Sequence, residues 1–134
     1  MPNNNHIDVS VVIPAFNEEK FITICLDSLV HQKTGKKFEV IIVDNNSTDN
    51  TRKVAEKYQE KLNLKVISEK IKGRGAARGA GFNIAKGELI FSTDADAKIS
   101  TDWIDVLSGF FIKDNIIAVT GTCKIVDCSF ITNM

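Results

Sequence analysis

The stretch Leu89-Ile90-Phe91-Ser92-Thr93-Asp94-Ala95-Asp96 decides the expected fold, because an apolar run ends there in two carboxylates one residue apart. Carboxylates rarely enter a hydrophobic core without partners, since removing water from a charge is costly. The run therefore predicts a buried strand that reaches the surface at Asp94 and Asp96. Residues two apart on an extended segment point the same way, so both carboxylates could face one hard cation such as Mg²⁺ or Mn²⁺.

The rest of the chain alternates apolar, β-branched runs with segments of helical spacing, which is typical of a parallel α/β sheet. The predicted strands are residues 9–13, 38–43, 64–67, 88–91 and 116–119. We therefore expect a three-layer α/β/α fold with a mostly parallel, Rossmann-like central sheet. The expected organisation is a flexible tail at 1–8, one domain at 9–120, and the start of an incomplete region at 121–134.

Helices are expected between these strands. The predicted caps are Asn17 and Ser100 at helix N-termini and Gly87 at a C-terminus. The predicted buried faces are Phe21, Ile24, Cys25 and Leu29 on the first helix, Val54, Ala55 and Tyr58 on the second, and Trp103, Leu107, Phe110 and Phe111 on the last. The glycine-rich residues 73–86 pass from a loop into a helix.

Composition narrows the class of protein. A chain of 134 residues is long enough for one domain with a core. A formal net charge of zero gives no support for a nucleic-acid partner. No apolar run approaches the ~20 residues of a membrane span, the start lacks a signal-peptide pattern, and three cysteines without metal spacing favour a reducing compartment. We expect a cytoplasmic location, with the inner face of the membrane as the alternative.

Three polar clusters follow predicted strands, at residues 14–18, 44–49 and 93–96. Ligands of open parallel sheets bind beyond the carboxyl ends of the strands, so three clusters at these ends predict one binding site. Each cluster alone is equally explained by turn or cap chemistry. No Ser-His-Asp or Cys-His arrangement can be proposed from the sequence.

Arg74 and Arg78 are four residues apart, so they share one face of the predicted helix. Small residues between them, and Gly79 and Gly81 beyond, would let the backbone approach a ligand closely. A helix N-terminus with two guanidinium groups suits a diphosphate, although two arginines alone also fit a solvent-exposed basic face. The glycine spacing matches neither a Walker loop nor a dinucleotide fingerprint.

The chain resembles the family-2 glycosyltransferases with a GT-A fold in four motifs that occur in the family's order. Residues 9–18 are similar to the first strand and nucleotide-binding loop, and residues 43–51 to the second motif. Residues 73–88 are similar to the segment rich in glycine, arginine and alanine, and Asp94-Ala95-Asp96 falls where the metal-binding Asp-x-Asp sits.

The resemblance implies inverting transfer of a sugar from a nucleoside diphosphate sugar, with Mg²⁺ or Mn²⁺, to an unknown saccharide or lipid-linked acceptor. It implies that Asp96 is the direct metal ligand, that Asp94 contacts the metal and the ribose or sugar, and that Arg78 meets the nucleotide or its diphosphate. Asp44 would bond the base or ribose. The implied donor-binding set is Pro14, Ala15, Phe16, Glu18, Asp44, Asn45, Arg74, Arg78 and Asp94, of which the first three would line the base.

Two positions depart from the family pattern: Asn45 replaces a common second aspartate, and Gly79 replaces a common asparagine. Inverting transfer also needs a general base. The available carboxylates are Asp102, Asp105, Asp114 and Asp127, none of which lies in a recognisable base motif. We therefore expect a donor-binding half with little activity of its own.

Two alternatives remain open. The first is a non-catalytic nucleotide-binding or oligomerisation module, with a homodimer formed through the apolar residues of 121–134. The second is a nucleotidyltransferase, although residues 14–17, Pro-Ala-Phe-Asn, are not the glycine- and arginine-rich loop expected after its first strand.

Overall fold

The structure is a computed structural model that describes residues 5–112, 122–124 and 131–133. The elements in chain order are β1 (Val9–Ala15), α1 (Ile22–Val30), β2 (Phe38–Asp44), α2 (Thr51–Glu56), the 3₁₀ helix η1 (Lys57–Glu60), β3 (Leu64–Ser68), α3 (Arg74–Ile84), β4 (Leu89–Ser92), α4 (Trp103–Phe110), β5 (Thr122–Lys124) and β6 (Ile131–Asn133). The predicted strand at 116–119 lies outside the described residues. In the described parts of the chain, no helix is long and apolar enough to cross a membrane.

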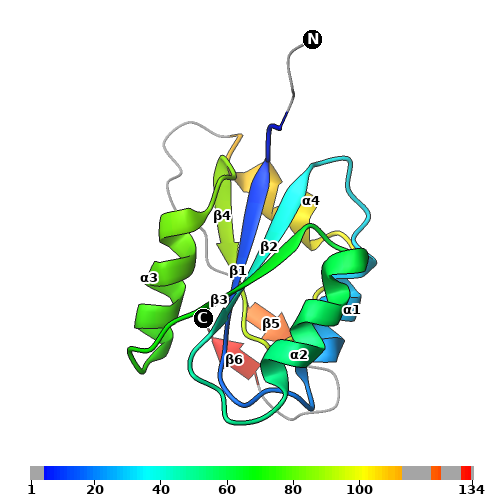
Figure 1. Ribbon diagram of the computed structural model, residues 1–134. Helices are drawn as coiled ribbons and strands as arrows, with labels where there is room; N and C mark the ends of the chain where they lie inside the picture. The colour runs from blue at the N-terminus through cyan, green and yellow to red at the C-terminus, as the bar shows by residue number, and fades with distance from the viewer. Residues whose placement is uncertain (1–4, 113–121, 125–130, 134) are drawn as a thin grey trace.

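The central sheet has the strand order β3-β2-β1-β4, and all its pairings are parallel. Figure 1 shows α3 on one side of this sheet and α1 and α2 on the other. The predicted α/β architecture with a parallel central sheet is confirmed. β5 and β6 form a separate antiparallel pair.

β1 is buried along its whole length, so its side chains divide the core between the two faces of the sheet. Val9, Val11 and Ile13 pack on the side of α1 and α4, whereas Val12 packs against α3. On the first side, Phe91 of β4 meets the ring of Trp103 of α4 edge-on, with the ring centroids 5.3 Å apart. This apolar sandwich fixes the strands that carry the polar clusters.

The predicted start of α1 is wrong. The helix begins at Ile22, and Asn17 instead adopts a left-handed conformation with φ 51°. Its side-chain oxygen accepts a hydrogen bond from the N–H of Thr48 rather than capping α1. The buried face is consequently shifted: it consists of Ile22, Cys25, Leu26 and Leu29.

Two residues predicted to be buried on α1 are therefore on its outer side, where Phe21 is 46% exposed and Ile24 is 45% exposed. The last helix shows a smaller difference. It starts at Trp103 without a side-chain cap from Ser100, and Phe110 is exposed, while Trp103, Leu107 and Phe111 pack partly buried against the core.

Gly81 and Gly87 allow close packing against β1. Gly81 was predicted to approach a ligand and Gly87 to cap a helix, and neither does so. A Cβ on Gly81 would lie 2.4 Å from a methyl carbon of Val12, so Gly81 faces the sheet and no ligand. α3 ends at Ile84, and Gly87 lies beyond its C-cap. A Cβ there would lie 2.4 Å from the backbone nitrogen of Ser10. Both glycines let neighbouring segments approach β1 more closely than any side chain permits.

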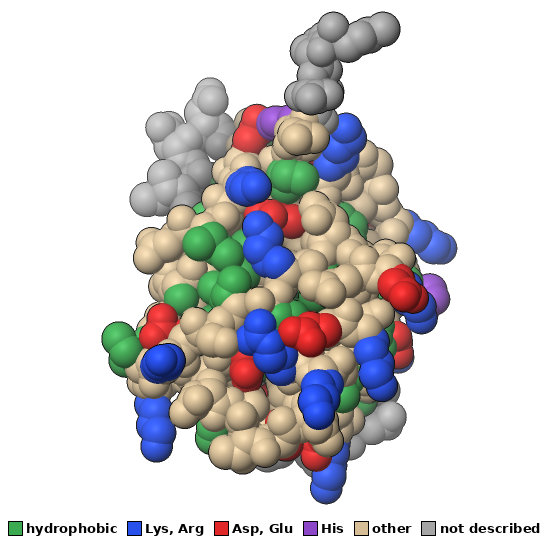
Figure 2. Space-filling view, in the orientation of Figure 1, with side chains coloured by type: hydrophobic (Ala, Val, Ile, Leu, Met, Phe, Trp, Pro, Cys, Tyr) green, Lys and Arg blue, Asp and Glu red, His purple; other side chains and the backbone are tan. Residues whose placement is uncertain are grey.

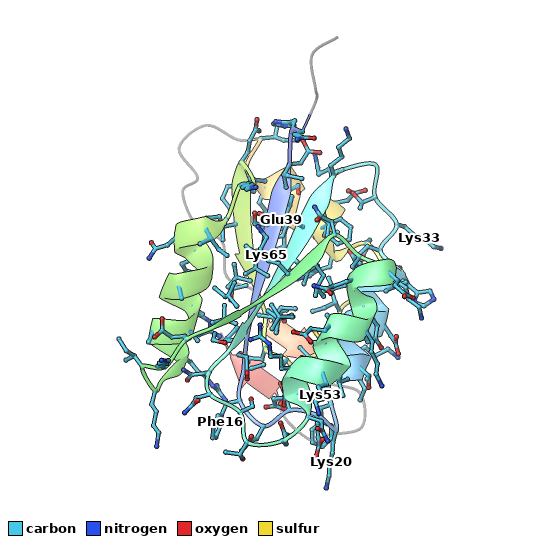
Figure 3. All side chains as sticks on the ribbon, viewed as in Figure 1. Phe16, Lys20, Lys33, Glu39, Lys53 and Lys65 are labelled. Carbon is cyan, nitrogen blue, oxygen red and sulfur yellow. The ribbon has the colours of Figure 1, made fainter. Side chains whose placement is uncertain are left out.

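A buried carboxylate ties the connection between α3 and β4 to the sheet. Glu39 accepts hydrogen bonds from the Ser10 hydroxyl at 2.6 Å and the Lys86 N–H at 2.8 Å, and it pairs with Lys65 at 3.3 Å. Burial alone would raise the pKa of Glu39, but these hydrogen bonds outweigh it and hold the pKa below its ordinary 4.5. Figure 3 shows Glu39 and Lys65 side by side, far from Phe16 at the other edge of the sheet.

Glycine-to-alanine substitutions in α3 test the packing of this helix. Gly81→Ala should lower the free energy of unfolding by about 1–3 kcal/mol, because the new methyl group meets stiff β-branched Val12. Gly79→Ala is the matched control, since a Cβ there meets no atom within 4 Å, and should raise stability by about 0.5–1 kcal/mol. Urea unfolding of both variants checks this; a shift in the same direction for both would contradict the packing.

Glu39→Gln tests the buried carboxylate. Because the folded-state pKa lies below the ordinary value, the charged group stabilises the fold above about pH 4.5, and this stabilisation is lost as pH falls through the folded pKa. The variant should be less stable than wild type by about 1–3 kcal/mol at pH 7, with a gap that narrows below about pH 4.5. Urea unfolding at several pH values measures it, with exposed Glu60→Gln as control. An equal gap at all pH values would refute the role of the charge.

Candidate functional site

A cavity of about 470 Å³ lies at the edge of the sheet where β1 and β4 end. Its size falls within the range of small-molecule sites. The edge is shared because the strands are parallel: Ala15 at the end of β1 is in register with Asp44 at the end of β2. The lining residues are Pro14, Ala15, Phe16, Glu18, Asn45, Lys72, Gly73, Arg74, Ala77, Asp94, Ala95 and Asp96.

Most of the predicted donor-binding residues therefore share one cavity, although they come from distant parts of the sequence. Asp44 and Arg78 are not on its wall. Asp44 is buried, and its carboxylate accepts a hydrogen bond from the N–H of Ser47. The cavity wall also includes Lys72, Gly73, Ala77 and Ala95, which are not in the implied donor-binding set. Lys72 could have been found, since it directly precedes the glycine-rich segment.

Three acidic side chains contribute to the wall: Glu18, Asp94 and Asp96. Partial burial raises the pKa of Glu18, and the nearby negative charge of Asp96 raises it further, while Arg74 opposes the shift. These carboxylates are therefore close enough to repel one another. An arrangement of like charges of this kind favours a bound cation.

The acidic residues do not form a complete metal site by themselves. Among the described residues, no group of three or more His, Cys, Asp or Glu side chains is arranged to hold a metal ion. Mg²⁺ commonly takes one or two carboxylates and completes its shell with water and phosphate oxygens. The donor set of Asp94 and Asp96 fits a cation that arrives with a phosphorylated ligand.

Arg78 contacts Asp94 without being part of the cavity wall itself. Its Nη2 lies 2.9 Å from Asp94 Oδ1, and its Nε donates to the Ser92 hydroxyl at 3.2 Å. That hydroxyl in turn donates to the carbonyl of Val12 at 2.9 Å. The chain of contacts fixes the direction of the Asp94 carboxylate relative to β1. Arg78 thus acts on the site through Asp94.

The cavity wall also has an electropositive part, at the N-terminus of α3. α3 begins there at Arg74, after Gly73, whose φ of 126° is a conformation that L side chains rarely adopt. Gly73 brings no capping side chain, so the N–H groups of the first turn lack the partner that a cap would supply. Lys72 and Arg74 add two cations to this helix end. An anion is the ligand that such a wall favours.

The loops after β1 and β2 are fastened to each other by side chains of the 47–51 segment. The Asn17 N–H donates to the Ser47 hydroxyl, and the Glu18 N–H donates to the Thr51 hydroxyl at 2.8 Å. Asp49 accepts a hydrogen bond from the N–H of Glu19. The segment therefore holds Glu18 at the cavity and does not itself line it.

Figure 2 shows one face of the molecule, on which hydrophobic side chains gather over α3 and β4. Phe82 of α3 is 42% exposed and Ile90 of β4 is 44% exposed. Basic and acidic side chains are interspersed over the rest of this face. Phe16, labelled in Figure 3, lies at the lower edge and is 54% exposed, so it offers a ring surface at the cavity.

Sequence comparison identifies the family to which the chain belongs. The sequence model described as "Glycosyl transferase family 2" matches residues 10–133. Chondroitin synthase of Pasteurella multocida is 34% identical over 133 residues, which are 98% of this chain and 14% of that protein. Poly(ribitol-phosphate) beta-N-acetylglucosaminyltransferase TarS of Staphylococcus aureus is 39% identical over 104 residues, 75% of this chain and 18% of that protein. The chain thus spans under a fifth of the length of these relatives.

Solved structures agree with the sequence comparison. The crystal structure of S. aureus TarS in complex with UDP superposes with a TM-score of 0.74 at 38% identity, over 79% of this chain and 32% of that one. The mannosyltransferase PcManGT from Pyrobaculum calidifontis, in complex with GDP-Man and Mn²⁺, gives a TM-score of 0.63 at 33% identity, over 69% and 28% of the two chains. The predicted resemblance and the GT-A type of fold are confirmed.

Substitutions of Arg74 and Arg78, the two arginines of α3, should differ in their effect on stability. Arg78→Met should lower the free energy of unfolding by about 1 kcal/mol or more, because Asp94 and Ser92 lose a charged partner. Arg74→Met removes the same charge from an exposed position and should change stability by less than about 0.5 kcal/mol. Thermal unfolding of both variants measures the difference. Equal losses would show that Arg78 is not the residue that holds Asp94.

Proposed function

Because the chain belongs to glycosyl transferase family 2, we propose that its cavity binds a nucleoside diphosphate sugar together with a divalent cation. The chain would supply the donor side of glycosyl transfer with inversion at the anomeric carbon. The observation that carries the proposal is the make-up of the cavity wall, which brings Asp94 and Asp96 together with Lys72, Arg74 and the N-terminus of α3.

Acidic and basic groups in one cavity complement a metal ion that is bound to a diphosphate. The carboxylates of Asp96 and Asp94 would hold Mg²⁺ or Mn²⁺, which when bound supplies Lewis-acid stabilisation of the leaving diphosphate. The first-turn N–H groups of α3, with Arg74, would bind phosphate oxygens directly. Arg78 would keep Asp94 oriented for this task through their 2.9 Å contact. The acidic residues would thus bind the metal ion, and the basic residues with the start of α3 would bind the diphosphate of the same ligand.

The nucleoside would occupy the part of the cavity formed by Pro14, Ala15 and Phe16. Phe16 is exposed at the cavity and could stack on a base, while the other two are buried in β1 and form a rigid floor. We propose uridine as the base, because the solved relative at 38% identity holds UDP or UDP-GlcNAc. GDP-Man in the relative at 33% identity makes guanosine the alternative.

We assign no general base among the residues that the structure describes. Asp102 and Asp105 lie on or next to α4, away from the cavity wall, and Asp114 and Asp127 lie outside the described residues. The acceptor, a homodimer through residues 121–134 and a cytoplasmic location stay predictions from the sequence. We propose that this chain binds its donor but transfers sugar slowly or not at all when it is alone.

Calorimetry tests the proposed donor site. UDP and UDP-GlcNAc should bind in the presence of Mn²⁺, and chelation of the metal should weaken binding at least about tenfold, a loss of about 1.4 kcal/mol. GDP and GDP-mannose should bind more weakly. Asp96→Asn should remove the metal-dependent part of the affinity. Asp102→Asn is the matched control, since it changes an exposed aspartate that is not on the cavity wall.

The result that would overturn the proposal is a folded chain that binds none of the four nucleotides with Mn²⁺. Tighter binding of GDP than of UDP would overturn the choice of base and leave the donor site standing. Equal Mn²⁺ dependence in wild type and Asp96→Asn would reject Asp96 as a metal ligand.

A further inference from the structure

Asn45 occupies an unusual position at the junction of three segments. It directly follows β2, is only 7% exposed, and forms part of the cavity wall. Its backbone N–H donates to the carbonyl of Ala15 at the end of β1 at 2.8 Å. Its side chain points toward the segment between β3 and α3, residues 69–73, which we call the 69–73 loop. This side chain therefore links the central strands to the positive wall of the cavity.

The side-chain amide of Asn45 makes three hydrogen bonds to the backbone of the 69–73 loop. Its Nδ2 donates to the carbonyl of Glu69 at 2.8 Å and to the carbonyl of Ile71 at 2.7 Å. Its Oδ1 accepts from the N–H of Gly73 at 3.0 Å. An amide has two N–H donors, and both are used here. Asn45 consequently has no N–H left with which to recognise a base.

Only an amide fits this set of partners. An aspartate carboxylate of the same shape has no proton to donate, so the oxygen that replaces Nδ2 would face the carbonyls of both Glu69 and Ile71. Leaving two carbonyl acceptors unpaired beside a buried charge is unfavourable. The departure from the aspartate that is common in the family is therefore matched by a loop whose carbonyls require a donor.

The 69–73 loop carries the groups that the proposed function assigns to the phosphates. Gly73 is the residue before α3, and Lys72 and Arg74 flank it on the cavity wall. The position of Gly73 sets where the first turn of α3 begins and which way its N–H groups point. The hydrogen bond from Gly73 to Asn45 is thus a direct link between β2 and the anion-binding end of the helix.

We propose that Asn45 is a positioning residue: it clamps the 69–73 loop so that Lys72, Arg74 and the start of α3 face the cavity, and it does not itself contact the base through its N–H groups. The link to nucleotide affinity rests on the proposed function. The clamp itself is a property of the free chain and can be tested without any ligand.

The first test uses the wild-type chain. Both side-chain NH₂ protons of Asn45 should exchange with solvent at least about tenfold more slowly than those of the next residue, Asn46, because hydrogen-bonded buried protons are protected. Asn46 is exposed, so it provides an internal reference. NMR hydrogen exchange of the assigned side-chain amides gives the ratio. Equal exchange rates would overturn the clamp whatever the chain binds.

The second test uses Asn45→Asp with Asn46→Asp as the matched control. Asn46→Asp makes the same chemical change at an exposed position whose φ of 65° aspartate tolerates. In Asn45→Asp the backbone N–H of Gly73 should exchange faster by about tenfold or more, while amides of β1 and β2 keep their protection. Affinity for UDP with Mn²⁺ should fall at least about tenfold in Asn45→Asp and should stay near the wild-type value in Asn46→Asp.

The outcomes separate the clamp from the donor site. A folded Asn45→Asp chain with unchanged Gly73 exchange and unchanged UDP affinity would overturn the proposal. An equal loss of UDP affinity in Asn46→Asp would also overturn it, since that indicates an effect of the added charge and not of the clamp. If wild type binds no nucleotide, the proposed function fails, and the side-chain exchange of Asn45 still decides whether the clamp exists. If Asn45→Asp does not fold, the wild-type exchange ratio decides as well.

Discussion

The parallel pairing of β1 between β2 and β4 is the constraint on which the rest of the structure depends. Parallel strands present their carboxyl ends at the same edge, so polar residues far apart in the sequence meet there. β1 is buried along its whole length, and the two glycines at 81 and 87 let α3 and the start of β4 lie close against it. Any loosening of β1 would therefore displace the groups that line the cavity.

Hydrogen bonds from neighbouring residues fix the charged groups that line the cavity. Arg78 holds Asp94, and Asn45 holds the 69–73 loop that carries Lys72. Both N–H donors of the Asn45 side chain are already used by the carbonyls of this loop. Side chains fixed in this way lose little further entropy when a ligand binds, which favours affinity at a small site. A preorganised pair of opposite charges suits a metal-bound diphosphate.

Much of this fold could be predicted from the sequence, and the failures share one physical cause. Apolar runs ending in polar clusters located the strands and the shared edge, since strand burial leaves a local pattern. Asn17 and Gly81 were misread because each fits a local rule, for a cap or for a close ligand approach. Their partners lie more than 30 residues away in the sequence, at Thr48 and Val12. Tertiary contacts thus override local propensity at these positions.

A crystal structure of the chain grown with UDP and Mn²⁺ is the sharpest test of the proposed donor site, with the manganese located by its anomalous scattering. We expect one manganese peak in contact with Asp96 and Asp94, and diphosphate oxygens between that ion and the first turn of α3. The uracil ring would lie against Phe16. Manganese or UDP bound away from the cavity, or a diphosphate that does not reach α3, would show that the donor site is not where we propose.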